Sequence, residues 1–291
     1  MKRLSPWLLV LLSGLLAVAA GWALGEPSVA DSPTPSAVCP ADTNHFVYLP
    51  LVFKAPDACE PIPETEYNVV LSVNDLYDPT KPSPENNPDY RLSLLGYYPV
   101  DRYKGLVNYG PTNDSKAPKF TTLFEGQPTP PILNTYQANG WDWDNHQPIS
   151  GTPHGFEVTV IGLQSSPKAI VRVPDSGYVI GWDCGDGGCD AMVIYASRWE
   201  ISLKYTREDR VSYPPPQKAG FTVHIVGICV EPSLRALYEQ MNAQGRYYLP
   251  AVRGGQPIGR AWGGEIAVAI RDDGPFMDPR DCDSFWKGYC P

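Results

Sequence analysis

Residues 252–279 read VRGGQPIGRAWGGEIAVAIRDDGPFMDP, and this stretch carries the strongest fold signal in the chain. Within it Ile266, Val268 and Ile270 alternate with small or polar residues, which is typical of a strand with one buried face. The glycines before this run permit tight turns and positive φ angles, and the Asp-Asp-Gly after it is typical of a hairpin turn. We therefore predict a strand over 265–271.

The rest of the second half predicts further short strands and a single helix. Leu234, Tyr238 and Met241 fall on one face of segment 232–244, which opens on a proline and is followed by Gly245. Proline suits a first helical turn and glycine suits a helix end, so this segment predicts an amphipathic helix. The strand candidates are 156–162, 169–173, 178–182, 192–195, 200–205 and 221–230.

These patterns predict a mainly β fold, a β-sandwich or open barrel with one short helix, over residues 150–291. Before it, the segment 60–149 has strand candidates at 68–73, 91–98 and 120–124, separated by Pro, Asn and Asp turns. We expect this earlier segment to form an irregular β-rich region packed on the main domain.

The composition favours turns and strands and argues against strongly anionic partners. The 291 residues include 32 Pro, 26 Gly and 17 Tyr, and the formal net charge is −9. Because the chain has no cluster of basic residues, the electrostatic footprint of a nucleic-acid-binding protein is missing from the sequence. Attraction to an anionic membrane surface is not expected for the same reason.

The N-terminus predicts export. Lys2 and Arg3 precede an apolar run over 7–20, and small residues suited to cleavage follow it. We expect a signal peptide over 1–30 and a secreted or cell-envelope-associated, extracytoplasmic protein. The alternative is an uncleaved anchor, because the apolar run approaches the ~20 residues that span a bilayer. Residues 31–59 form a Pro-rich leader with a short apolar strand motif, and no membrane span is expected once the signal is cleaved.

Seven cysteines in an exported chain predict disulfides. Cys184 and Cys189 flank a Gly-Asp-Gly-Gly turn that would bring them together. Cys282 and Cys290 lie close to each other in the C-terminal tail. We predict one disulfide within each of these two pairs.

The other three cysteines leave one without an obvious partner. Cys39 and Cys59 bracket the apolar motif of the leader and are a third candidate pair. Cys229 lies inside the apolar run 223–230, and we predict that it is a buried, reduced thiol.

Three segments, in order, resemble the lysostaphin/LytM-type peptidoglycan zinc metallopeptidases. Residues 152–158, TPHGFEV, are similar to the family's His-containing HxGxD motif, and residues 169–180, AIVRVPDSGYVI, are similar to GTPVYAPADGTVV. The stretch 252–279 is similar to VKAGQPIGRAG, PHLHFEIRDNG and VDP, and is the most specific of the three. The resemblance covers less than half of the chain and implies a lysostaphin-like β fold for residues 150–291.

The residues that would hold zinc depart from the family pattern. Members of the family bind zinc through a His and an Asp of the first motif and the second His of HxH. Here Glu157 takes the Asp place, Thr152 or Pro153 stands near the first ligand, and HxH is replaced by a run from Glu265 to Ala267. An alanine methyl group has no lone pair for a metal. The resemblance therefore implies a catalytically degenerate relative, with no catalytic residue, no metal ligand and no cofactor.

The family's groove would still serve for binding, because its walls are backbone and aromatic side chains. Exposed Trp beside carboxylates suits sugar or peptide ligands. The alternative is an active zinc endopeptidase whose site is rebuilt from two histidines and two glutamates. The groove candidates are His154, Glu157, His224, Glu265, Trp182 and Trp262.

Three functions follow from these observations. The first is a binding or interaction module at the bacterial cell envelope, acting on cell-wall glycan or peptide or on an envelope protein. The second is a zinc endopeptidase that acts on peptidoglycan through the rearranged site. The third is a structural exported domain without a ligand.

Overall fold

The structure, a computed structural model, describes residues 59–73, 83–111, 114–150, 156–211 and 220–291. The signal segment, the leader up to residue 58, Cys39 and His154 lie outside these residues. The predictions made for them stay predictions.

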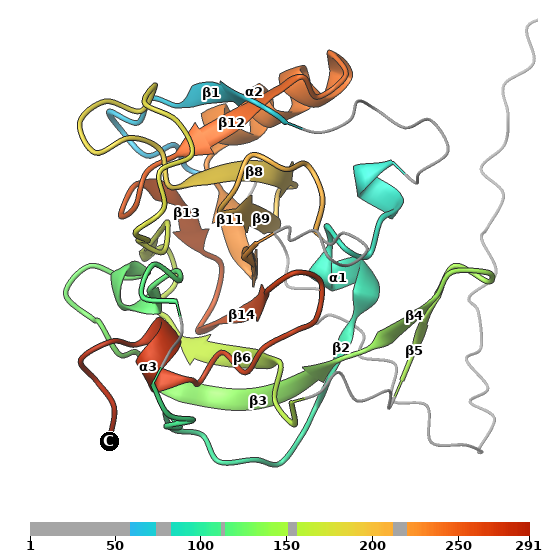
Figure 1. The fold of residues 1–291 in the computed structure, drawn as a ribbon, viewed down its shortest axis with the longest axis vertical. Helices are drawn as coiled ribbons and strands as arrows, with labels where there is room; N and C mark the ends of the chain where they lie inside the picture. Colours follow the sequence, from blue (N-terminus) through green and yellow to red (C-terminus); the bar gives the residue numbers. More distant parts are fainter. Residues whose placement is uncertain (1–58, 74–82, 112–113, 151–155, 212–219) are drawn as a thin grey trace, which may run out of the picture. The chain divides into compact units, whose positions relative to one another are not determined.

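Nine strands form one antiparallel sheet in the order β1-β12-β8-β9-β10-β14-β6-β3-β2 (Figure 1). The predicted strand over 265–271 is β14, which lies between β10 and β6. The mainly β fold is thereby confirmed. The bounds of the nine strands are β1 Asn68–Leu71, β2 Tyr97–Pro99, β3 Ile132–Ala138, β6 Val160–Gln164, β8 Ala191–Ala196, β9 Glu200–Lys204, β10 Thr222–Val226, β12 Tyr248–Val252 and β14 Glu265–Arg271.

Smaller elements complete the described fold. A three-stranded sheet has the order β11-β13-β7, and β4 pairs with β5 in a hairpin. The bounds are β4 Gly140–Asp142, β5 Gln147–Ile149, β7 Ile170–Arg172, β11 Ile228–Val230 and β13 Pro257–Ala261. The helices are α1 Leu92–Leu95, α2 Pro232–Ala243 and α3 Cys282–Phe285, and the 3-10 turns are η1 Pro84–Asn86 and η2 Phe120–Thr122.

Helix α2 confirms the helix predicted near 232–244. The Glu231 carboxylate caps it by accepting hydrogen bonds from the backbone N–H groups of Ser233 at 2.7 Å and Leu234 at 2.9 Å. Leu234 and Tyr238 are buried on its inner face. Gly245, with φ +89°, follows its end, a conformation that glycine adopts without strain.

The alternation in β14 divides its side chains between the two faces of the large sheet. Ile266, Val268 and Ile270 join the larger apolar cluster, while Ala267 and Ala269 join a second, smaller one. The larger cluster also takes in side chains of β7, β11 and β13, so the three-stranded sheet packs on that face.

Several local predictions were wrong. The segment 91–98 is not one strand, because it forms helix α1 and then β2, with Gly96 at φ +74° between them. The strand predicted over 120–124 is the turn η2. Segment 178–182 contributes only an isolated bridge at Gly181. In place of one short helix, the described residues of the segment 150–291 contain α2 and the four-residue helix α3.

The segment before residue 150 contributes strands β1, β2 and β3 to the large sheet. The sequence pattern did not identify β3, although β3 forms seven residues of strand and pairs with β6. Residues 221–230 form two strands in place of one, because Gly227 has φ +85° and turns the chain from β10 into β11.

Three disulfides link the described cysteines. Cys184 bonds to Cys189 and Cys282 to Cys290, as the spacing predicts. The prediction of a reduced Cys229 was wrong, because Cys229 bonds to Cys59 across 170 residues of sequence. This bond also rules out the candidate pairing of Cys59 with Cys39. It joins the start of the described chain to β11.

No helix within the described ranges is long and apolar enough to cross a membrane.

Candidate functional site

The resemblance points to the face of the large sheet that carries Ala267. In the strand register Ala267 lies opposite Gly162 of β6 and Val226 of β10, while Ala269 lies opposite His224. Residues paired across neighbouring strands project from the same face, with Cβ atoms about 5 Å apart. We call this surface, which carries Ala267, Ala269 and Gly162, the alanine face.

The chain's own apolar side chains cover the alanine face. Leu92 and Leu95 of α1 and Phe276 pack in one cluster with Ala267 and Ala269. Ala267 is only 6% exposed, and Leu92 is fully buried. The position that resembles the second zinc-binding histidine is therefore part of an apolar core.

Beside this core, the polar residues of β9 are buried as well. The Glu200 carboxylate accepts hydrogen bonds from the Ser93 backbone N–H at 2.9 Å and the Ser93 hydroxyl at 2.5 Å. The Arg91 guanidinium lies 3.8 Å from it. Burial raises the pKa of Glu200. The polar face of the Glu-Ile-Ser-Leu-Lys strand thus packs under the segment that contains α1.

His224 lies in the same buried layer. Its Nδ1 is 2.8 Å from the Ser202 hydroxyl, which donates its own proton to the Tyr90 carbonyl at 2.6 Å. The Nδ1 atom must then carry the proton and donate to Ser202, which leaves Nε2 as a bare acceptor. Nε2 is buried without a hydrogen-bond partner in the part of the chain that is described. Burial, and then the positive charges of Arg271 and Lys204, hold the pKa of His224 well below its ordinary value.

Lys204 completes the buried polar layer. Its ammonium donates to the Gly220 carbonyl at 2.7 Å and to the Thr222 hydroxyl at 3.2 Å. Burial lowers its pKa from 10.5 to about 7. Hydrogen bonds within the protein satisfy the charged side chains of this layer, and these side chains are buried from solvent.

Glu265 lies at the end of the alanine face and is half-buried. Its carboxylate accepts hydrogen bonds from the Asn134 amide at 2.6 Å and from the Tyr136 hydroxyl at 2.7 Å. A Cβ atom on Gly162 would collide with this carboxylate, so the glycine makes room for it. The two donors fix the carboxylate in one position.

Trp262 precedes Glu265 in the turn from β13 to β14. Its ring packs edge-on against Trp199, with the ring centroids 4.5 Å apart. The Arg198 guanidinium covers the Trp199 ring at 4.5 Å. Both indoles are half-buried by these contacts, so Trp262 is mainly a packing residue.

The remaining groove candidates lie elsewhere. Glu157 is exposed and forms an ion pair with Arg102 at 2.8 Å. The residue opposite Glu265 is Gln164, seven positions further along the chain than Glu157. Glu157 lies before the start of β6 and Gln164 ends it, so Glu157 is at the opposite end of this strand from Glu265. Trp182 is 74% exposed and lies two residues before Cys184, which is disulfide-bonded to Cys189.

The five described groove candidates therefore do not converge on one groove. His224 is inaccessible, Glu265 and Trp262 share one turn, and Glu157 and Trp182 are each exposed elsewhere. One group of three potential metal ligands is close enough to share an ion among the described residues, namely Cys282, Asp283 and Cys290. Its two cysteines are bonded to each other, and a zinc ligand needs a thiolate.

The sequence patterns did not identify the buried polar residues beside the alanine face. Glu200 and Lys204 alternate with apolar residues, a pattern that normally indicates a solvent-facing side of a strand. The one available signal was the Leu92 to Leu95 spacing, which brings both side chains to one side of a helical turn.

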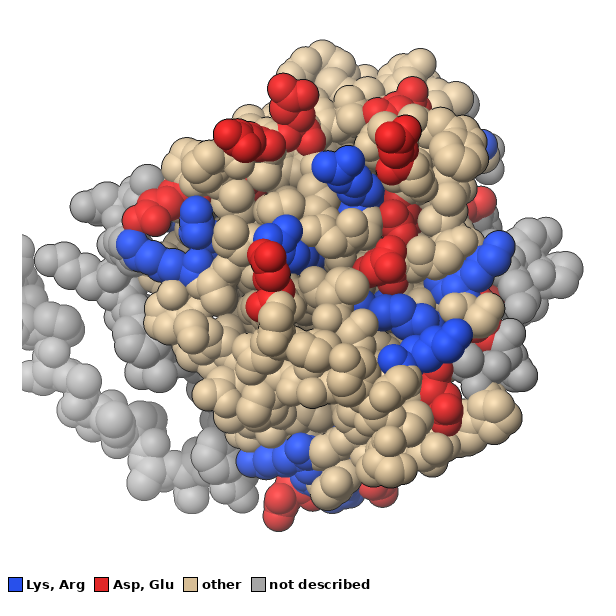
Figure 2. All heavy atoms as spheres, turned by 90° about the vertical axis from the view of Figure 1, so that its left-hand side faces the viewer, with Lys and Arg blue, Asp and Glu red and all other residues tan. Residues whose placement is uncertain are grey.

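On the face shown in Figure 2, acidic and basic side chains are interspersed, and carboxylates gather towards its upper end. That end is at the height of β1 and β12 in Figure 1.

Comparison with models of known protein families, with curated proteins and with solved structures finds no match to this chain.

Proposed function

We propose that this chain is an exported, non-catalytic binding module of the bacterial cell envelope, built on a degenerate LytM-type domain. Its partner is a cell-wall glycan or peptide or an envelope protein. The filled alanine face is the observation that carries this proposal.

A catalytic zinc needs about three protein ligands and an open position for water. The LytM-type pattern would put one ligand at the position of Ala267, which offers only a methyl group. Leu92, Leu95 and Phe276 occupy the space above it. Neither a metal-bound water nor a peptide bond could reach this position without displacing α1.

The three disulfides support an extracytoplasmic site of action. Disulfides persist in oxidising compartments and are rare where glutathione keeps thiols reduced. Together with the basic and apolar N-terminal residues, they favour export. Three cross-links suit a module that must stay folded outside the cell.

The experiment combines three measurements on the purified chain. We expect no stoichiometric zinc after dialysis, no release of muropeptides from purified sacculi, and co-sedimentation with those sacculi. About one zinc per chain with chelator-sensitive release would identify a zinc endopeptidase and overturn the proposal. Absence of both hydrolysis and co-sedimentation would leave a structural domain or one that binds an envelope protein.

A further inference from the structure

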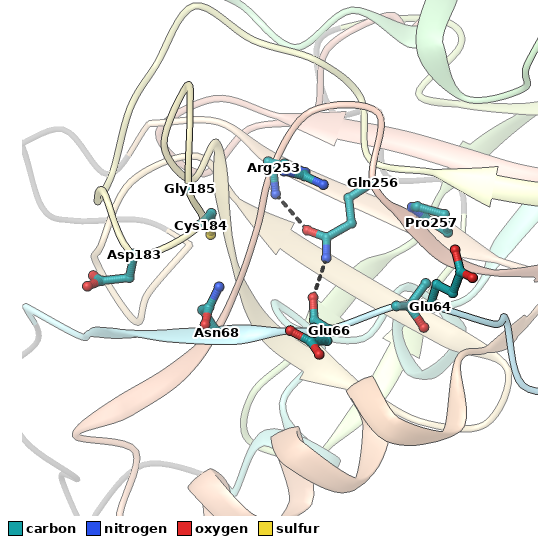
Figure 3. Close-up of a pocket in the computed structure, with 10 residues that line it drawn as sticks. Glu64, Glu66, Asn68, Asp183, Cys184, Gly185, Arg253, Gln256 and Pro257 are labelled. Carbon is teal, nitrogen blue, oxygen red and sulfur yellow. Dashed lines mark hydrogen bonds between the residues drawn. The ribbon is translucent and has the colours of Figure 1, made fainter.

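A polar pocket of about 440 Å³ lies beside β1, and none of its lining residues belongs to the alanine face (Figure 3). Three segments line it, residues 64–68, 183–185 and 253–257. Ligand pockets in proteins commonly have volumes of ~300–1,000 Å³, so this one could hold a ligand of a few sugar rings.

The lining offers both acceptors and donors of hydrogen bonds. Glu64, Glu66 and Asp183 supply carboxylates, while Asn68 and Arg253 supply an amide and a guanidinium. Among the described residues, no hydrogen bond or ion pair engages the three carboxylates. Their oxygens are available to the hydroxyl groups of a ligand.

The walls of the pocket are held in place. The Gln256 amide accepts a hydrogen bond from the Arg253 backbone N–H at 3.0 Å and donates one to the Glu66 carbonyl at 2.8 Å. Figure 3 shows the first bond within the turn after β12 and the second joining that turn to the segment before β1. On the other side, Asp183 directly precedes Cys184, which is anchored by its disulfide to Cys189. A pre-formed site loses little conformational entropy on binding.

The exposed side chain of Trp182 also indicates a ligand-binding site. It directly precedes Asp183, and its 74% exposure is the highest among the large hydrophobic side chains described. Val179, on the same loop, is 46% exposed. An exposed indole two residues before a disulfide-bonded cysteine offers a surface for stacking, with an apolar face and one N–H donor.

The charges of the residues that line the pocket restrict the class of ligand that it can bind. Three carboxylates and one guanidinium line the pocket, so an anionic ligand would meet net repulsion. A sugar ring combines an apolar face for an indole with hydroxyl groups for carboxylates and amides. We propose that this pocket and Trp182 bind a short stretch of neutral glycan, of hexose or N-acetylhexosamine units. The assignment rests on the proposed function and names the glycan, not the peptide, as the wall component that is bound.

The test is a titration of the purified chain with the soluble tetramer of N-acetylglucosamine, followed by tryptophan fluorescence and calorimetry. We expect saturable binding that weakens by at least ~10-fold in Trp182→Ala and in Asp183→Asn. Trp143→Ala is the matched control, because Trp143 is also an exposed indole, on the β4–β5 hairpin. It should leave the affinity unchanged. Thermal unfolding of each variant shows that the fold is retained.

No binding of the tetramer, or equal affinity for Trp182→Ala and the unaltered chain, overturns the assignment. Binding of a lysine tetrapeptide in its place shows a peptide site and also overturns it. Sacculus co-sedimentation separates this result from the proposed function. If the unaltered chain and Trp182→Ala sediment equally, the glycan site fails while the proposed function stands. If the tetramer binds and sacculi do not, the cell wall fails as the partner in the proposed function while the glycan site stands.

Discussion

The alanine face and the β1 pocket differ in what they present to solvent. The strand of the alanine face resembles part of the LytM-type pattern without its metal ligands, and α1 and Phe276 cover this face with apolar side chains. The pocket beside β1, here called the β1 pocket, is open and polar, and the exposed Trp182 directly precedes its lining residue Asp183. A sequence motif can locate a strand in the fold, but solvent accessibility decides whether that surface can bind a ligand.

Placing a histidine on the alanine face is the most severe test of whether that face is closed to ligands. Ala267→His would force an imidazole into space that Leu92, Leu95 and Phe276 occupy. Overpacking and an unpaired buried polar group together should lower the free energy of unfolding by ~4 kcal/mol. Urea denaturation measures it, with Ala243→His at the exposed end of α2 as the matched control. A variant of unchanged stability would show that this face has room for a ligand.

Removing the cover should have the next largest effect. Leu92→Ala deletes a fully buried side chain and should cost ~3 kcal/mol of stability. Leu133→Ala, at a position 37% exposed on β3, is the control and should cost little. Affinity for the N-acetylglucosamine tetramer should stay the same in both. A glycan affinity that falls with Leu92→Ala would place the binding site on the alanine face.

Because Lys204 is buried, its ionisation should make the free energy of unfolding depend on pH. Its pKa is about 7 in the folded chain, against an ordinary value of 10.5. Between these values the unfolded chain binds more protons than the folded chain, so stability rises as pH rises. From pH 7 to about pH 9.5 we expect a gain of ~2–3 kcal/mol in unfolding free energy.

Lys204→Met should flatten this rise, whereas Lys168→Met should leave it in place, because Lys168 is exposed and paired with Glu60. Urea denaturation over the same pH range measures both variants. An unchanged slope in Lys204→Met would show that Lys204 is solvated and that the layer is open to water.

The disulfide beside the pocket should matter more for binding than for stability. It joins cysteines five positions apart in the sequence, so replacing Cys184 and Cys189 together by Ala should cost only ~2 kcal/mol. Without this cross-link, Trp182 and Asp183, which directly precede Cys184, should be held less firmly, and the chain should bind the tetramer more weakly, by several-fold. Calorimetry on the paired variant measures this. An unchanged affinity would remove the loop from the site.

Local patterns predicted the elements whose cause is local. Helix α2 has its cap, its apolar face and its closing glycine within one segment, and β14 alternates along its whole length. The two short-range disulfides follow from loop spacing. The Cys59–Cys229 bond closes 170 residues, and only the folded sheet brings those two cysteines together.

The site could be predicted only in part. Trp182 and Glu265 were named from the sequence, but nothing local shows that one is exposed and the other is held by Asn134 and Tyr136. Helix α1 is a single turn, and so short a helix depends on tertiary packing for its stability. The pocket is assembled from three distant segments, which no local spacing could join.

Amide hydrogen exchange with and without the N-acetylglucosamine tetramer tests the central contrast most directly, because it reports both surfaces at once. If the β1 pocket binds the ligand, we expect added protection in peptides that cover residues 64–71 and 181–189, and no change in peptides that cover β14 and α1. Added protection across β14, with none at residues 64–71 and 181–189, would contradict the account and return ligand binding to the alanine face.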